Sequence, residues 1–264
     1  MSKSTWTGAV SSDWNDANNW SPAGIPGVNS DVVIASGAPV ASASIGTVNS
    51  ITDSSDLSFE SAGANTIATF LDNTGSLNVD DSAGEGGTTL DIGGTPTNGF
   101  GHHLTIGNPT LSAPDTVTAA SLDNTGKIQL TGSGANQALL DVTGSAGFGS
   151  AGVLSGNVRV TRDSAIEFAT GEITSLAAHA QLHLNGSHAF IEDSTALDSN
   201  SALTGLASIG TGATLDLENR ASLSTTGALV NDGTIYLDIT DGDSGSSLTV
   251  AGALSNVAPR RRTR

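Results

Sequence analysis

The chain has 264 residues, of which 37% are apolar, 13% are charged and 33 are glycine; its formal net charge is -17 and it has no cysteine. This composition excludes disulfides and thiolate metal sites, and the acidic charge argues against nucleic acid as a ligand. No apolar stretch approaches the roughly 18 residues of a transmembrane helix, so no membrane span is predicted. Regularly placed Leu, Ile and Val among the glycines predict turns and thin strands rather than a disordered chain.

The first 35 residues differ from the rest of the chain. They contain all three tryptophans, Trp6, Trp14 and Trp20, in an irregular segment with two prolines, Pro22 and Pro26. The end of a stack of strands leaves an edge that must be covered. Residues 1–35 are therefore predicted to form an N-terminal cap.

A nine-residue phrase recurs in the body of the chain. Leu71–Val79 (LDNTGSLNV) returns as Leu122–Leu130 (LDNTGKIQL) and as Leu229–Leu237 (LVNDGTIYL). Each copy joins an Asn-x-Gly turn to a short strand of alternating apolar and polar residues, a unit that buries its apolar side only by stacking on neighbours. The intervals between copies are near multiples of about 25 to 27 residues, the length of one β-helix coil. Residues 36–257 are predicted to form β-solenoid repeats.

The predicted fold is an all-β, parallel β-helix (β-solenoid) of roughly ten coils, on the order of 50 Å long at about 4.8 Å per coil. A stack of hairpins is the alternative, but parallel coils are favoured because the phrase always recurs in the same direction. Helix is not predicted, apart from a weak period over residues 173–182.

The phrase has two invariant positions with a structural interpretation. Asn tolerates the left-handed conformation, and its amide can bond the adjoining coil to build an Asn ladder, whereas a sugar-binding polar stripe is the functional alternative. The structural residues predicted in this way are Asn73, Gly75, Asn124, Gly126, Asn231 and Gly233, with a partial match at Asn256.

The pattern W-x-G, D-W-x-x-x-x-N-W-S, P-G and D-V-V-I, followed by L-x-N-x-G repeats, resembles the start of repeat regions in large bacterial surface and secreted proteins of the autotransporter and adhesin type. The resemblance spans roughly residues 5–256 and implies a right-handed parallel β-helical passenger region. It also implies a secreted or cell-surface location. Residues 1–20 hold no apolar run of signal-peptide length, and the chain is expected to be a segment of a longer protein.

Three features could support chemistry. Asp238, Asp241 and Asp243 lie on a Gly-containing turn and could bind calcium through carboxylate oxygens, but the spacing is not that of an EF-hand. Histidines 102, 103, 179, 183 and 188 lack the helical spacing of a metalloprotease motif, and coil stacking leaves a zinc site open. The basic run 258–264 is predicted to be a disordered tail.

The third feature that could support chemistry, after the acidic turn and the histidines, is a set of charged residues. A polysaccharide-cleaving β-helix could use them as acid, base and cation, although their spacing selects no pair. They are Asp163, Glu167, Glu172, Glu192, Asp193, Asp216 and Glu218, with Arg159, Arg162 and Arg220. No nucleophile motif occurs, and no catalytic residue is predicted.

The sequence therefore favours a non-catalytic extracellular module of an adhesin-like protein that binds by many weak contacts. Its expected partners are glycans or the surface of a host or neighbouring cell, with self-association through the solenoid ends, and it requires no cofactor other than the calcium considered above. The alternative is a carbohydrate-active β-helix enzyme, either a polysaccharide lyase or a glycoside hydrolase, with a carboxylate groove.

Overall fold

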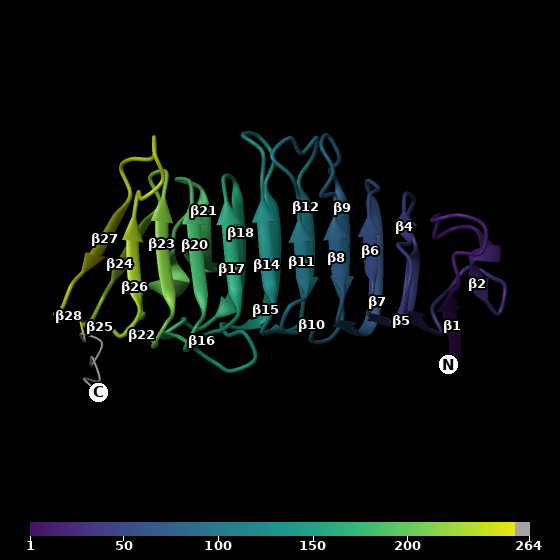
Figure 1. Ribbon diagram of the computed structural model, residues 1–264, viewed down its shortest axis with the longest axis horizontal. Coiled ribbons are helices and arrows are strands. Elements are labelled where there is room, and N and C mark those ends of the chain that lie inside the picture. Colours follow the sequence, from purple (N-terminus) through teal and green to yellow (C-terminus); the bar gives the residue numbers. More distant parts are fainter. Residues whose placement is uncertain (257–264) are drawn as a thin grey trace, which may run out of the picture.

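The chain is an elongated stack of short strands, in which sequence order follows the long axis from one end to the other (Figure 1). The structure is a computed structural model that describes residues 1–256, so the predicted tail at 258–264 lies outside the described residues. It is all-β, and the helical elements within the described residues are two 3-10 turns, η1 (Ala17–Asn19) and η2 (Ser201–Leu203). The weak helical period at 173–182 corresponds to strand and turn instead, because its apolar residues enter the shared core.

The strands form two large sheets, one five-stranded sheet and one strand pair. The twelve-stranded sheet contains β1 (Ser2–Trp6), β2 (Trp20–Ser21), β3 (Ser30–Ile34), β5 (Gly46–Asp53), β7 (Gly63–Asn73), β9 (Thr88–Ile92), β10 (Thr97–Asn98), β12 (Asp115–Ala119), β13 (Asp123–Asn124), β15 (Ala138–Ser145), β18 (Ser164–Thr170) and β21 (Ala189–Asp193). The nine-stranded sheet contains β4 (Val40–Ala41), β6 (Asp56–Phe59), β8 (Ser76–Val79), β11 (His103–Ile106), β14 (Lys127–Thr131), β17 (Asn157–Thr161), β20 (Gln181–Asn185), β23 (Thr214–Glu218) and β26 (Thr234–Leu237). The five-stranded sheet contains β16 (Val153–Leu154), β19 (Ser175–Leu176), β22 (Ser208–Ile209), β25 (Leu229–Asn231) and β28 (Leu254–Asn256), and the pair is β24 (Ser222–Thr225) with β27 (Ser247–Val250).

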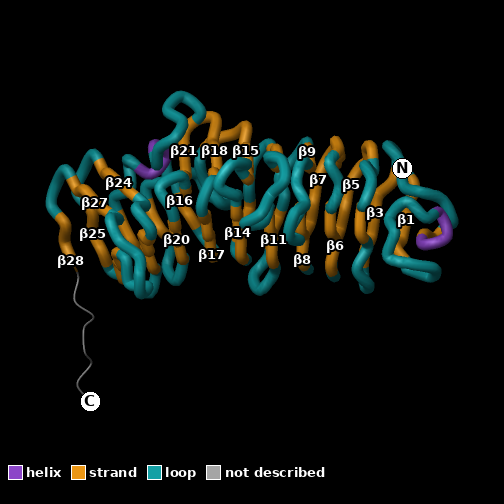
Figure 2. Tube along the Cα trace, turned by 90° about the horizontal axis from the view of Figure 1, so that it is seen from above, coloured by secondary structure: helices purple, strands orange, loops and turns teal. Residues whose placement is uncertain are grey.

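The chain winds through these sheets in a repeating order. From β14 in the nine-stranded sheet it passes to β15 in the twelve-stranded sheet, then to β16 on a short third side, and returns to β17 beside β14. Ladders between the described strands are parallel, except for the antiparallel pair β1 and β2. The prediction of parallel strands is therefore confirmed, and a stack of hairpins is excluded. Figure 2 shows the strands lying side by side along the stack, with loops leaving at the corners.

The interior is filled by aliphatic columns that run across the nine-stranded sheet. Alternate residues of each strand point inward, so equivalent positions of successive coils stack. One such column joins Leu57, Leu77, Leu104, Ile128, Val158, Leu182 and Leu215, all of them buried. Full burial of each such side chain contributes about 1.5 to 3 kcal/mol, so the columns are the main source of stability.

The length of a coil varies more than the near-regular intervals of the phrase predict. Asp56 pairs with Ser76 across a short coil, whereas Gln181 pairs with Thr214 across a much longer one. The strands keep their register because extra residues leave at the corners, as in the segment 194–207 that carries η2. Counting residues along the sequence therefore does not give the register.

The three tryptophans pack against one another at the N-terminal end. The ring centroids of Trp6 and Trp20 are 5.0 Å apart and those of Trp14 and Trp20 are 4.7 Å apart, both edge-to-face, and all three residues are buried. The indole Nε1 of Trp20 donates to the backbone oxygen of Trp14 at 2.8 Å. β1 and β3 pair in parallel within the twelve-stranded sheet, and the segment between them, 7–29, contains η1 and β2.

Buried asparagines connect three successive coils. Asn73 Nδ2 donates to Asn98 Oδ1 at 2.9 Å, and Asn98 Nδ2 donates to Asn124 Oδ1 at 2.7 Å. A second pair joins Asn231 to Asn256 at 2.9 Å. The asparagines of the phrase lie in strands without positive φ, so the left-handed expectation is wrong. Their amides bond the adjoining coil, and Asn73 Oδ1 and Asn231 Oδ1 also accept from the backbone N–H of Gly75 and Gly233, both at 3.1 Å.

The glycines of the phrase are required by close approach of the backbone. A Cβ atom would overlap the backbone oxygen of Ser55 at Gly75, of Gly99 at Gly126 and of Ala213 at Gly233. None of these three glycines has a positive φ. The turn of each coil therefore lies directly on the backbone of the preceding coil.

Candidate functional site

The outer face of the nine-stranded sheet changes from neutral to charged side chains along the stack. One outward column begins with the neutral residues Ser58, Asn78, Thr105 and Gln129 and continues with Arg159, His183, Asp216 and Tyr236. The charged half is the strongest candidate for a functional site, because in-register strands hold its side chains at neighbouring positions.

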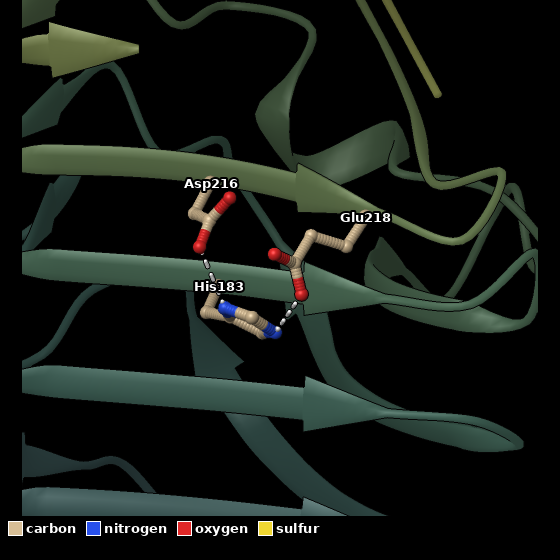
Figure 3. A group of neighbouring side chains, drawn as sticks. All are labelled: His183, Asp216 and Glu218. Carbon is tan, nitrogen blue, oxygen red and sulfur yellow. Dashed lines mark hydrogen bonds and ion pairs between the residues drawn. The ribbon is translucent and has the colours of Figure 1, made fainter. Parts of the chain in front are cut away.

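His183 lies between two carboxylates from the next strand (Figure 3). Its Nδ1 is 2.9 Å from Asp216 Oδ2, and its Nε2 is 3.5 Å from Glu218 Oε2. Positions 216 and 218 are two residues apart on β23, so both side chains point outward beside β20. The Asp216 contact has the geometry of a good hydrogen bond, whereas the Glu218 contact is a looser ion pair.

Glu218 is buried and well bonded. Its Oε1 accepts from the Thr240 hydroxyl at 2.5 Å, and its Oε2 accepts from Asn185 Nδ2 at 3.1 Å. By contrast, His183 Nε2 and Asp216 Oδ1 are buried without a hydrogen-bond partner. The cluster is thus a structured polar network with two unsatisfied atoms.

The cluster offers one nitrogen and two carboxylate ligands. Ligand atoms of His183, Asp216 and Glu218 all lie within 4.8 Å of one another, a donor set suited to a divalent transition metal. Glu60, Asp81 and Glu85 form a second such group, whose oxygens suit a hard cation.

The predicted calcium residues lie on the loop next to Glu218. They are not brought together as a group of ligands among the described residues, where the two groups above are the ones found. Asp238 instead accepts from the backbone N–H and hydroxyl of Ser246, at 2.9 and 2.7 Å, and these bonds lower its pKa, the hydroxyl more. Asp241 is exposed, and Asp243 has a buried Oδ2 without a partner. The calcium site stays a prediction.

The residues considered for polysaccharide cleavage are divided between different faces. Asp216, Glu218 and Arg159 belong to the nine-stranded sheet, whereas Glu167 and Glu192 are paired in register on the twelve-stranded sheet. Desolvation by burial raises the pKa of Glu192 to about 7. Asp193 ends the same strand, β21, and lies near Glu167. The remaining members lie outside the strands, and Arg162 and Arg220 have positive φ; they are Asp163, Arg162, Glu172 and Arg220.

A pocket of about 350 Å³ lies beside the starts of strands β11, β14, β17 and β20. Phe100, Lys127 and three histidines, His102, His103 and His179, are among the residues that line it, and none of the lining residues is acidic. Lys127 also lies near Arg159, whose charge lowers the pKa of Lys127 after the larger effect of desolvation. The cationic residues do not cluster along the sequence, but the stacking of coils brings these two together.

The sequence offers His183 only as one of five histidines for which a zinc site is left open, and it does not single out Lys127 or Phe100 as site residues. A usable signal exists, since Arg159, His183 and Asp216 are each a polar residue between two apolar residues of a short strand: VRV, LHL and LDL. This pattern marks an outward position in a buried strand. Aligning the three strands by it predicts the column, whereas counting residues does not.

Apart from the His183 cluster, Asp80 and Asp115 form a buried pair of carboxyl groups. Thr88 N–H donates to Asp80 Oδ2 at 3.0 Å, and Gly87 N–H donates to Asp115 Oδ1 at 2.8 Å. Asp80 Oδ1 and Asp115 Oδ2 are buried without a hydrogen-bond partner, and the two side chains interact with each other, an arrangement that fits one shared proton. Desolvation raises the pKa of Asp115, and the contact with Asp80 raises it further.

We expect Asp115→Asn to stabilise the protein at pH 8 by about 1 to 2 kcal/mol. Because the folded-state pKa of Asp115 is raised, the folded state holds a proton that the unfolded state releases above about pH 4, so wild-type stability falls as pH rises through this window. The Asn amide donates permanently to Asp80. Urea unfolding of the wild type and the variant at pH 4 and pH 8 measures the change in stability, with the exposed Asp91→Asn as the control. An equal pH dependence of stability in Asp115→Asn and the wild type would refute the shared proton.

The fold is that of an all-β protein of the solenoid class with long parallel sheets. Among the described residues, no helix is long and apolar enough to cross a membrane. Residues 5–84 match the model of a domain of unknown function (DUF8693), a region that holds the tryptophan cluster and the first coils but not His183 or Lys127. No curated protein and no solved structure matches the chain.

Proposed function

We propose that the chain is a non-catalytic β-solenoid module of a bacterial surface or secreted protein of the adhesin type, which binds saccharides through many weak contacts. In this proposal the coils are right-handed, about ten in number, and closed at the N-terminal end by the tryptophan segment acting as a cap. The tryptophan packing and the parallel sheets support that arrangement.

The observation that carries the proposal is the neutral half of the nine-stranded sheet. Ser58, Asn78, Thr105 and Gln129 are partly exposed and follow one another on successive coils. The coils are about 4.8 Å apart, so hydroxyl and amide groups recur along the face at a spacing comparable to the repeat of successive sugar units in an extended polysaccharide. Each contact is weak, and repetition supplies the affinity.

A carbohydrate-active enzyme is the second candidate, favoured by the His183, Asp216 and Glu218 cluster with Arg159 on the neighbouring strand. A general acid or base must reach the proton that it transfers. Glu218 is buried beneath bonds from Thr240 and Asn185, and Asp216 is held by His183, so binding without cleavage is the better supported function.

The proposed location is secreted or cell-surface, as the resemblance to adhesin-type repeats implies. We also propose self-association through the solenoid ends. Exposed apolar side chains of the last described coils, Leu237, Ile239 and Leu254, support it, since apolar surface favours contact with another protein surface.

The test is a panel of immobilised neutral and acidic polysaccharides, with calcium or with a chelator, read for retention of the protein and for release of reducing or unsaturated ends. We expect retention without product. Product that disappears in His183→Gln would replace the proposal with the enzyme, and absence of both retention and product would refute it. Calcium-dependent retention that is lost in Asp243→Asn would support the calcium loop.

A further inference from the structure

The pocket beside Lys127 is an unusual feature of an acidic molecule. The sequence has 26 acidic and nine Lys or Arg residues, so a cation is expected to have carboxylate neighbours. The ion pairs within the described residues are those of His183, so neither Lys127 nor Arg159 is paired with a carboxylate. Two cations held close together without a counter-charge favour an anionic ligand.

The pocket also presents an apolar surface. Phe100 is 88% exposed at its rim. An exposed aromatic ring provides a flat face against which the C–H side of a sugar ring can pack. Asn157 and Gln181, whose side chains bond each other at 3.0 Å, add amide groups for sugar hydroxyls on the adjacent strands.

We propose that this pocket binds a carboxylated sugar unit of an acidic polysaccharide, with the carboxylate at Lys127 and the sugar ring against Phe100. The inference rests on the proposed function, because it names the saccharide class that the sheet recognises. His102 and His103 line the same pocket and add positive charge when they are protonated. Arg159 lies on the strand beside Lys127, in register with Gln129 two residues further along.

Nucleic acid is a poorer fit for the same charges. Duplex DNA carries one negative charge per about 1.7 Å and requires an extended basic surface. Near this pocket the chain provides one lysine and one arginine, Lys127 and Arg159, and its net charge is -17. A sugar acid brings a single carboxylate per ring and an apolar ring face, which matches one lysine beside one aromatic ring.

The test uses a fluorescent galacturonate trimer and its methyl ester, which is the same sugar without the charge. We expect the acid to bind about tenfold more tightly than the ester at low salt, and Lys127→Gln to remove that difference, since a hydrogen bond to a charged group contributes about a factor of ten or more. Phe100→Ala should weaken both ligands. Raising the salt from about 20 to 200 mM should weaken the acid alone.

The matched control is Lys3→Gln, which removes a lysine outside the pocket, and unfolding curves verify that each variant folds. Equal binding of acid and ester, unchanged binding by Lys127→Gln, or tighter binding of a single-stranded oligonucleotide would overturn the inference. Retention of neutral polysaccharides with no preference for the acid would overturn the inference while leaving the proposed function intact, whereas retention of none would remove both.

Discussion

Replacing Trp14 with alanine is expected to destabilise the N-terminal coils by about 4 kcal/mol. Trp14 has no exposed surface, its ring packs edge-to-face on Trp20, and its backbone oxygen accepts the Trp20 indole N–H. Removal of the ring leaves a large cavity beside Trp20, the central ring of the three, and Trp20 cannot close it without losing its contact with Trp6.

The loss should be local, because each coil of a solenoid contacts only its neighbours. Chemical unfolding should show an early transition, and limited proteolysis should cut the variant first within residues 7–29. Phe100→Ala is the control, since an exposed aromatic residue outside the core should change stability by less than about 0.5 kcal/mol. A single unshifted transition in Trp14→Ala would show that the tryptophan cluster does not hold this end of the stack.

Gly126→Ala should cost about 3 kcal/mol or more, although it adds a single methyl group. The new Cβ would overlap the backbone oxygens of Gly99 and His102, which belong to the preceding coil. Backbone cannot rotate away as a side chain can, so two coils must separate and the hydrogen bonds between them lengthen. The Asn98 amide lies in the same contact, so the ladder is disturbed as well.

Gly227→Ala is the matched control for this substitution. Neither glycine has a positive φ, and a Cβ at Gly227 meets nothing within 4 Å. The control should be neutral or stabilise by up to about 1 kcal/mol through the unfolded state. Urea midpoints of the two variants provide the comparison, and similar values would contradict the close stacking of turn on backbone.

The sequence predicts the fold class well because the fold is made of local units. The Asn-x-Gly phrase marks the turns, and alternation in short strands marks which side chains enter the core. Asn98 escapes this prediction because it is followed directly by Gly99, so only its position between Asn73 and Asn124 reveals it as part of the ladder.

The candidate site could not be predicted as a unit because it depends on register between coils. His183 and Asp216 lie on neighbouring strands, but the coil that joins them is longer than the coils before it by the segment that carries η2. Lys127 and Arg159 lie on strands separated by the Gly-rich excursion 144–152. Because extra residues leave the stack at the corners, the strands stay in register while the sequence distance between paired residues varies. Residues of different coils that form one site therefore share no linear motif.

The central claim is that saccharides bind to the nine-stranded sheet face. Hydroxyl-radical footprinting with and without polygalacturonate measures this directly, because aromatic and histidine side chains are labelled where solvent reaches them. The account predicts protection of Phe100, His102 and His103, with no change at Phe70, an exposed aromatic residue of the twelve-stranded sheet. Protection at Phe70 with none at Phe100 would place binding on the other sheet and contradict the account.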